Sequence, residues 1–339
     1  MKCRAPRAED HVFRVPCSVE RVAGKRVARI LHAAPMLALV LLLSACGGPR
    51  AASRPAVQRD AYYHRMITSG HGAFQRGDIG RAAELYENAF IRAQIMDRPA
   101  AVGSSAYNLA LCHIALGDLE EGRDLLREAR IELRRAGESG VETLIAEAEV
   151  TRKLGDAEAA WLLTDEAVQA LEGVRARAVR LQVHSLRALM ALERDDPERA
   201  AEERTLAERH IRRDTALRLL ARLAEVNGRL LLAGGETRLA AQEFDLETMY
   251  YRNEARFADM ARAMSRAASA YQKVGDHTVA VDRFYRAARH YAADGSPVEA
   301  LRLVEKALPS LEEADDPEWA SRLTALFEKL TETVKIKGE

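Results

Sequence analysis

Seven short dipeptides recur along the sequence at an almost constant spacing, and they constrain the fold more than any other feature. These turn marks are Gly77-Asp78, Gly117-Asp118, Gly155-Asp156, Asp195-Asp196, Gly235-Glu236, Gly275-Asp276 and Asp315-Asp316, spaced 40, 38, 40, 40, 40 and 40 residues apart. Glycine adopts the left-handed conformation that ends a helix, and an acidic residue directly after it can cap the next helix. Between the marks, apolar residues recur at helical spacing without strand-like alternation. The sequence therefore predicts a helix pair in each period, with helices of about 15 to 18 residues.

Small residues accompany the turn marks at fixed distances. Five residues beyond the start of each mark lie Ala82, Gly122, Ala160, Ala200, Ala240, Ala280 and Ala320. Seven residues further on lie Ala89, Ala129, Ala167, Ala207, Glu247, Ala287 and Phe327. Seven residues before each mark lie Gly70, Ala110, Ala148, Ala188, Gly228, Ala268 and Leu308. Small side chains at these places predict close approach of paired helices, with larger residues such as Tyr86, Phe244 and Phe284 filling the adjacent gaps. Two capping boxes are also expected, at Asp118–Glu121 and Ser296–Glu299.

This order of small residue, aromatic, turn, alanine and aromatic resembles the tetratricopeptide (TPR) repeat. The first repeat shows it as Gly70, Phe74, Gly77-Asp78, Ala82 and Tyr86. The resemblance implies an all-α fold, a right-handed α-solenoid of about seven helix-turn-helix repeats over residues 59–335. The period departs from the family, being near 40 residues rather than about 34. Repeat four lacks the aromatic residues and has Arg204 where the first repeat has Tyr86. The last repeat has Leu308 and Phe327 at small-residue places, which is typical of a terminal cap. A generic helical bundle is the alternative.

The N-terminal segment has the features of an export signal. A basic stretch, Lys25 to Arg29, precedes an apolar run, and Ala33 to Ala45 is an uninterrupted stretch of 13 residues. That length is short of the roughly 20 residues that a membrane-spanning helix needs. The preceding stretch is long and partly acidic for a signal, so we expect translation to begin near Val22 at an alternative start codon.

The end of this segment, Leu43-Ser44-Ala45-Cys46, resembles the lipobox of bacterial lipoprotein signals. The resemblance implies that residues 1–45 are a cleaved signal peptide and that Cys46 carries a diacylglycerol and an N-acyl chain. Residues 46–58 then form a flexible tether. Gly47 stands where aspartate would signal inner-membrane retention, which implies the outer membrane, facing the periplasm. The alternative is a short apolar stretch followed by a chance cysteine.

Charge and cysteine content narrow the function classes. The chain holds 51 basic and 51 acidic residues, which gives no indication of nucleic-acid binding. After cleavage the balance is 43 basic to 48 acidic, a net charge of −5, because residues 1–45 hold eight basic and three acidic residues. Cys112 then has no intramolecular partner beside a lipidated Cys46, so we expect a small buried apolar residue without a disulfide.

No catalytic or cofactor pattern stands out. The sequence contains no phosphate-binding loop, HExxH, GxSxG or CxxC motif, so we expect no enzyme activity and no cofactor. His64 and His71 share a helix face, but no third ligand completes a metal site there. Acidic pairs such as Glu120-Glu121, Glu202-Glu203 and Glu312-Glu313 are expected to lie on solvated helix faces.

A TPR-like solenoid implies a groove lined mainly by the first helix of each pair, which binds a protein or peptide segment. Helical phase predicts two groups of lining residues: Ile67, His71, Tyr107, Asn108 and Leu111 in the first two repeats, and Arg222, Arg229, Arg262, Ser265, Ser269 and Lys273 in repeats five and six. The second group is basic and is expected to attract acidic segments. In the alternative reading, the arginines only solvate the face and Tyr107 packs internally.

The sequence does not support the dicarboxylate clamp of chaperone-binding TPR proteins. Among the positions where the clamp residues are expected, only Asn108 has a matching side chain. Two hypotheses for the function remain. The first is a non-enzymatic scaffold or adaptor for an envelope assembly, anchored to the outer membrane. The second is an envelope sensor or carrier that binds a peptide or a peptidoglycan fragment. A cryptic hydrolase is a distant third. Self-association through the last repeat, near Trp319 and Phe327, is left open.

Overall fold

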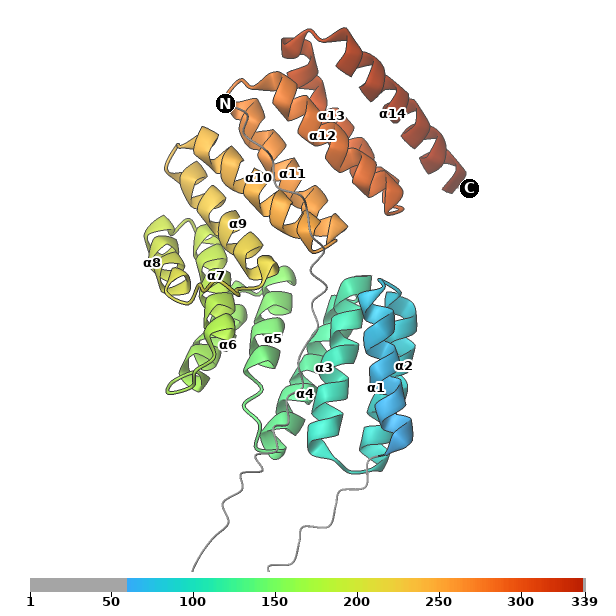
Figure 1. Ribbon diagram of the computed structural model, residues 1–339, viewed down its shortest axis with the longest axis vertical. Helices are drawn as coiled ribbons and strands as arrows, with labels where there is room; N and C mark the ends of the chain where they lie inside the picture. The colour runs from blue at the N-terminus through green and yellow to red at the C-terminus, as the bar shows by residue number, and fades with distance from the viewer. Residues whose placement is uncertain (1–59, 338–339) are drawn as a thin grey trace, which may run out of the picture. The chain divides into compact units, whose positions relative to one another are not determined.

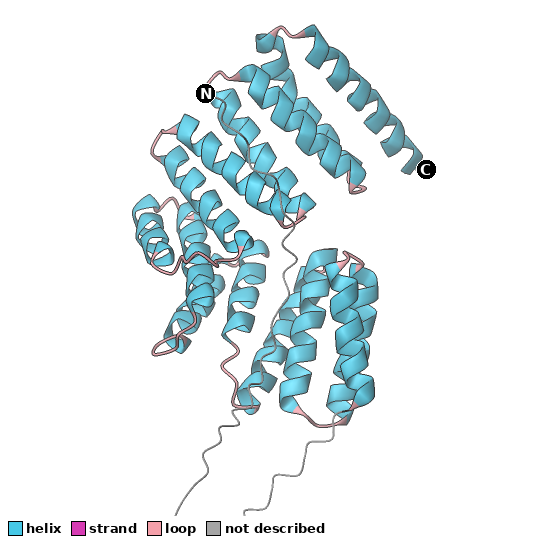
Figure 2. Cartoon of the chain, in the orientation of Figure 1, coloured by secondary structure: helices cyan, strands magenta, loops and turns pink. Residues whose placement is uncertain are grey.

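The computed structural model describes residues 60–337, which form fourteen helices joined by short turns and contain no strand (Figures 1 and 2). In order, the helices are α1 (Ala61–Gln75), α2 (Ile79–Ile95), α3 (Pro99–Leu116), α4 (Leu119–Arg135), α5 (Val141–Lys153), α6 (Ala157–Ala170), α7 (Arg177–Glu193), α8 (Pro197–Glu208), α9 (Leu217–Ala233), α10 (Thr237–Asn253), α11 (Phe257–Lys273), α12 (His277–Ala293), α13 (Pro297–Ala314) and α14 (Pro317–Lys337). Each helix packs against the next one in the chain. The fold is an α-solenoid of seven TPR-like helix pairs within these residues, as the sequence predicts.

Every turn mark joins the two helices of a pair. Its first residue has a positive φ in all seven cases, between 45° at Asp315 and 97° at Gly117. This conformation is costly for residues other than glycine, and only Asp195 and Asp315 adopt it here without being glycine. The second residue directly precedes the next helix, at the N-cap position. Asp78, Asp156 and Asp196 each accept a hydrogen bond from the backbone N–H three residues on.

The two expected capping boxes are absent, so that prediction was wrong. Neither Asp118 nor Ser296 accepts a capping hydrogen bond through its side chain. The Asp118 carboxylate instead lies 3.4 Å from Nδ1 of His113 in the preceding helix. Asp276, the N-cap residue of α12, likewise makes no capping hydrogen bond through its side chain, which accepts a hydrogen bond of 2.6 Å from Arg238 of the previous repeat.

The small residues lie where paired helices approach most closely. A Cβ atom added at Gly70 would come within 2.9 Å of the Tyr86 ring, and one added at Gly228 within 2.5 Å of the Phe244 ring. Ala82, Ala200 and Ala280, at the position after the turn, are fully buried. The regular spacing of small residues in the sequence therefore marks the contacts between paired helices, because larger side chains do not fit at these contacts.

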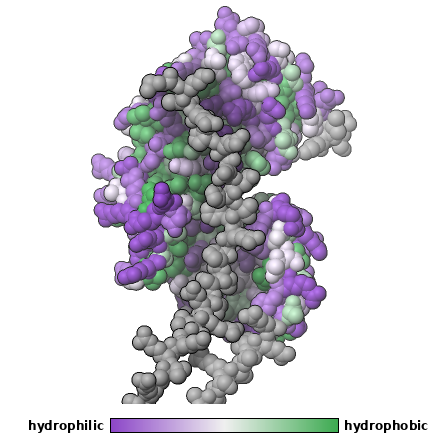
Figure 3. All heavy atoms as spheres, viewed as in Figure 1, coloured by the Kyte–Doolittle hydropathy of each residue, from purple (hydrophilic) through white to green (hydrophobic). Residues whose placement is uncertain are grey.

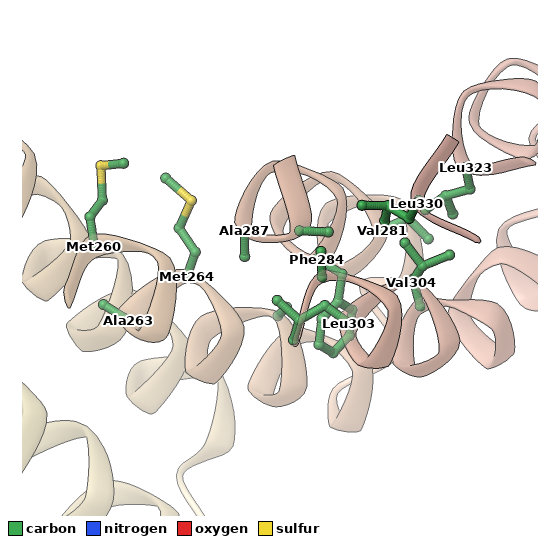
Figure 4. Close-up of a cluster of buried hydrophobic side chains, with 14 of the residues drawn as sticks. Met260, Ala263, Met264, Val281, Phe284, Ala287, Leu303, Val304, Leu323 and Leu330 are labelled. Atoms are coloured by element: carbon green, nitrogen blue, oxygen red, sulfur yellow. The ribbon is translucent and has the colours of Figure 1, made fainter. Parts of the chain in front are cut away.

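The apolar core is divided into clusters that each span neighbouring repeats. The largest extends from α9 to α14, and Figure 4 shows Phe284 of α12 within it, among Leu303 and Val304 of α13. A second cluster joins α1 to α5 and contains Cys112, which is fully buried. Burial raises the pKa of the Cys112 thiol to about 11.

The last helix pair differs from the others in what occupies its small-residue positions. Leu308 and Phe327, which replace small residues of earlier repeats, are 46% and 43% exposed. Trp319 packs against the core, with its ring centroid 5.5 Å from that of Tyr285 in an edge-on arrangement. Of the two aromatic residues near the terminus, Trp319 therefore contributes to the core of the last pair, while Phe327 remains largely accessible.

One acidic pair departs from the expected solvated position. Glu203 is 1% exposed, between α7 and α8, while its neighbour Glu202 is exposed. Arg187 donates to it at 2.8 Å, and Nδ1 of His184 lies 2.7 Å away. Glu147 of α5 is buried in a similar manner and accepts hydrogen bonds from Arg127 and Arg130 of α4. Buried carboxylates require such partners.

On the coloured part of the face in Figure 3, hydrophilic residues alternate with apolar patches. Among the described residues, no helix is both long and apolar enough to cross a bilayer. The expected signal peptide (residues 1–45), the tether (residues 46–58), the lipidation site Cys46 and the alternative start near Val22 all lie outside the described residues.

Candidate binding groove

The odd-numbered helices, the first of each pair, share one face of the solenoid, which we call the odd-helix face. Near α7 this face is concave. Helices two apart in the chain contact each other there, α5 with α7 and α7 with α9. Beyond them, Arg222 of α9 donates to Glu149 of α5 at 2.8 Å, although 73 residues separate the two. Side chains from helices two repeats apart can meet only over a surface that curves inward.

Ion pairs continue along the odd-helix face toward the C-terminus. Arg152 of α5 and Arg229 of α9 both approach Glu193 of α7, at 2.6 and 3.8 Å. Arg229 also pairs with Glu225 at 2.7 Å, within α9. These side chains form a charged row that alternates between arginine and glutamate from one odd-numbered helix to the next. Each arginine of the row pairs with a carboxylate of the chain itself.

The row ends at a buried carboxylate. Arg266 of α11 lies 3.7 Å from Glu225 and donates two hydrogen bonds to Glu247 of α10. Glu247 is fully buried at a position where five of the other six repeats have alanine. Burial raises the pKa of Glu247 to about 7 in spite of Arg266. The Glu149 carboxyl behaves in the opposite way. Burial works against its ionisation, but Arg222 outweighs that effect and lowers its pKa to about 2.

A pocket of about 320 Å³ opens on the odd-helix face beyond this row. Its lining comes from α9, α10, α11 and α13, and consists of Arg229, Leu232, Phe244, Ser265, Arg266, Ser269, Ala270, Lys273 and Lys306. Gln272 of α11 donates to the backbone carbonyl of Lys306 in α13 at 3.3 Å, which links the two helices at the pocket. The pocket therefore combines an apolar floor with cationic and hydroxyl groups.

The structure brings four of the predicted groove residues, Arg229, Ser265, Ser269 and Lys273, together at this pocket. The other two arginines of the basic group are held elsewhere. Arg222 pairs with Glu149, and Arg262 pairs with Asp259 of its own helix. The expectation that these arginines attract acidic segments is therefore revised, because carboxylates of the chain already pair with Arg222, Arg229 and Arg262.

The predicted residues of the first two repeats do not line the pocket between α9, α11 and α13. Ile67 and Tyr107 are half-buried and pack against the core cluster of α1 to α5, which fits the alternative reading for Tyr107. Burial raises the pKa of Tyr107. Leu111 is also half-buried. His71 and Asn108 make hydrogen bonds within their own helices, to Gln75 and to the carbonyl of Ser104.

A second pocket, of about 520 Å³, lies between α1 and α2. Arg65, Arg76 and Arg81 line it together with Met66 and Leu85. It contains none of the predicted groove residues.

Sequence reasoning missed Lys306 and Arg266. A signal was present, because Lys306 stands 40 residues after Arg266, at the same place in the next repeat. Asn108, which was predicted to line the groove, occupies that same place in the second repeat. Both Lys306 and Arg266 would have been predicted if the position of Asn108 within its repeat had been applied to every repeat.

Chemically, the arrangement is suited to binding. No group of three or more His, Cys, Asp or Glu side chains able to hold a metal ion occurs within residues 60–337. His184 and Glu203 form a buried pair, but it lies in repeat four within packed helices, apart from the lining of the pocket.

Comparison with known proteins identifies the fold. No protein-family model matches the sequence, and no curated protein matches it. Among solved structures, the chain is similar to the Rap conjugation gene regulator of the plasmid pLS20 in complex with the Phr* peptide, with a TM-score of 0.59 and 12% identity over 85% of this chain and 82% of that one. It is also similar to NprR in complex with its cognate peptide NprX, with a TM-score of 0.56 and 14% identity over 82% of both chains.

A third likeness is to a signal-transduction ATPase with numerous domains from Pyrococcus horikoshii, which carries a tetratricopeptide repeat sensor. The TM-score is 0.51 and the identity 11%, over 78% of this chain and 44% of that one. At this level of identity the likenesses concern the fold alone, and the fold they support for this chain is a TPR-like α-solenoid.

Proposed function

We propose that this protein is a non-enzymatic adaptor that binds a segment of another protein on its odd-helix face. The observation that carries the proposal is the pocket of about 320 Å³ that opens on this face between α9, α11 and α13. A solenoid presents a continuous surface without special loops, so a segment held at one pocket can extend along the neighbouring helices.

The similar structures support a peptide or protein partner. Both the pLS20 regulator and NprR were solved with a peptide bound, and each matches more than four fifths of this chain. We extend this mode of binding to the present chain because its odd-helix face is concave near α7 and open beyond α9.

Placement in the cell envelope is the second part of the proposal. Support comes from the apolar run that ends in Leu43-Ser44-Ala45-Cys46 and from the short segment between Cys46 and α1. We propose a lipid anchor on Cys46 and a location at the periplasmic face of the outer membrane, where the solenoid takes part in an envelope assembly. Substitution Cys46→Ser should move the protein out of the membrane fraction. Retention of the variant in that fraction would end the lipobox interpretation.

Site-specific photo-crosslinking in living cells tests the groove. A photoreactive residue at Ser265 or Ser269 should capture the same partner, identified by mass spectrometry. The matched control is Thr205, an exposed position on the second helix of repeat four. Adding Ser269→Trp, which fills the pocket, should abolish the crosslink from Ser265. Equal capture from Thr205, or capture that survives the tryptophan, would contradict the proposal.

A sensor or carrier of a small ligand remains a second candidate, favoured by the size of the pocket. A volume of about 320 Å³ lies at the lower end of the range for small-molecule sites. Native mass spectrometry of the protein purified from its host distinguishes the two functions. A stoichiometric peptide or peptidoglycan fragment supports the carrier, and a copurified protein supports the adaptor.

A further inference from the structure

We infer that the pocket between α9, α11 and α13 selects its partner by an acidic side chain, bound by Lys273 and Lys306. The inference rests on the proposed binding of a protein segment and names the chemistry that this segment must carry. It also reassigns the attraction for acidic groups from the predicted arginines to two lysines.

The cationic side chains of the pocket differ in whether the chain itself already pairs with them. Four line it, but Arg229 is held by Glu225 and Glu193, and Arg266 by Glu247 and Glu225. Across the described part of the chain, neither Lys273 nor Lys306 has a carboxylate within ion-pair distance. A ligand therefore does not need to displace an internal partner in order to pair with them.

The two lysines reach the pocket from two different helices. Lys273 ends α11 and Lys306 lies in the middle of α13, and a hydrogen bond from Gln272 to the Lys306 carbonyl links the two helices. Both side chains line one pocket from two neighbouring helices. An ammonium group on a flexible stem can adjust to a carboxylate that enters between them.

The rest of the lining defines what accompanies the acidic group. The Ser269 hydroxyl donates to the carbonyl of Ser265 at 3.0 Å, so its oxygen is left to accept a hydrogen bond from a ligand. Leu232, Phe244 and Ala270 supply an apolar side. The pocket therefore fits a glutamate or aspartate that neighbours an aliphatic residue, with backbone N–H groups near the serines.

The test uses two fluorescein-labelled, C-terminally amidated peptides. One has the sequence Gly-Ser-Leu-Glu-Glu-Leu-Ser-Gly, and its match has glutamine in place of both glutamates. Fluorescence anisotropy with the full chain in detergent should give a Kd roughly ten-fold lower for the acidic peptide, as expected for charge-assisted hydrogen bonds. Equal affinity for the two peptides would overturn the inference.

Charge reversal assigns the effect to the pocket. The double substitution Lys273→Glu and Lys306→Glu should weaken binding of the acidic peptide by about ten-fold or more. The matched control, Lys329→Glu and Lys335→Glu, makes the same change of charge on exposed positions of α14 and should leave the affinity unchanged. Circular dichroism confirms that both variants are folded. Equal loss in the two variants would show a general charge effect and refute the site.

A further probe separates this inference from the proposed function. A single-stranded oligodeoxynucleotide that competes as well as the acidic peptide would overturn selection of a protein segment. If the crosslinked partner is lost on Ser269→Trp but kept in the Lys273→Glu and Lys306→Glu variant, the adaptor function stands and the acidic selection fails. If neither variant alters the crosslink, the proposed groove itself fails.

Discussion

Two stretches of the odd-helix face differ although both have the same repeat architecture. Side chains of the chain itself bridge the stretch between α5 and α9, whereas a pocket opens in the stretch between α9 and α13. Between α5 and α9 the Glu149–Arg222 pair bridges the concave surface. Between α9 and α13 the pocket lies open. Glu149, Arg229 and Ser269 occupy the same place in their repeats, six residues before the turn mark. A long carboxylate with an arginine opposite closes the face, while a short serine beside unpaired lysines leaves space for a ligand.

This difference shows that the repeat lattice sets where side chains project and that pairing decides which of them are available. A basic composition is therefore a poor guide to an anion site on such a surface. Arg222, Arg229, Arg262 and Arg266 pair with carboxylates of the chain itself. Lys273 and Lys306 are the residues that we propose for binding a partner.

The largest expected effect is at the end of the charged row. Substitution Arg266→Ala leaves Glu247 buried without a cation, and should lower the free energy of unfolding by about 3 to 5 kcal/mol. The native pKa of Glu247, already about 7, would rise further, because the opposing effect of Arg266 is removed. A raised native pKa means that stability is present below about pH 4.5 and is lost as pH rises through the native value. Urea unfolding should therefore show a larger penalty at pH 8 than at pH 5.

The control for this prediction is Arg81→Ala, which removes an exposed pair with Glu84 and should change stability by less than about 0.5 kcal/mol. A penalty for Arg266→Ala that is no larger than the control would mean that Glu247 does not depend on it.

The next effect tests the packing beneath the open pocket. Substitution Gly228→Ala places a Cβ atom 2.5 Å from the Phe244 ring, which lines the pocket. Overpacking of this kind should cost about 1 to 3 kcal/mol. At Gly80, where nothing lies within 4 Å of an added Cβ, alanine should be neutral or gain up to about 1 kcal/mol. Thermal unfolding of both variants measures the contrast, and equal shifts would exclude the close contact.

A smaller effect is expected where the face is closed. At pH 7, Glu149→Gln should lower the free energy of unfolding by about 1 to 2 kcal/mol, because it removes the charge that Arg222 binds. The native pKa of Glu149 is lowered to about 2, so its contribution is present above about pH 4.5 and is lost as pH falls through the native value. Unfolding measured from pH 7 to pH 3 should show the difference between variant and native protein shrinking. A difference that stays constant would indicate a pair that is not formed.

The smallest effect concerns the proposed binding residues themselves. Lys273→Ala and Lys306→Ala should each change stability by less than about 0.5 kcal/mol, because neither side chain has an internal carboxylate partner. Differential scanning calorimetry provides the measurement. A loss as large as that for Glu149→Gln would show that the lysines stabilise the fold and are not reserved for a ligand.

Much of the architecture was predictable, because it depends on local chemistry. Glycine or aspartate at each turn mark adopts a positive φ, and the residue after it directly precedes the next helix. The small residues before the marks, such as Gly70 and Gly228, face the large side chains Tyr86 and Phe244 that follow them. These relations involve residues of one helix pair, so spacing alone exposes them.

The candidate site was only partly predictable. Helical phase placed Ser265, Ser269 and Lys273 on one face of a single helix, and in the structure all three line one pocket. Their relation to Lys306, and the pairing of Arg222 with Glu149, join different repeats. The burial of Glu203 and Glu247 was also missed, because their cations come from neighbouring helices.

By itself, then, the sequence determined that the chain forms seven helix pairs, where each pair turns and which residues bring its helices together. Only the tertiary structure decided which charges neutralise one another and where the odd-helix face stays open. The reason is physical. Backbone conformation and helix pairing depend on neighbours along the chain, whereas ion pairs and pockets depend on how far helices two repeats apart converge.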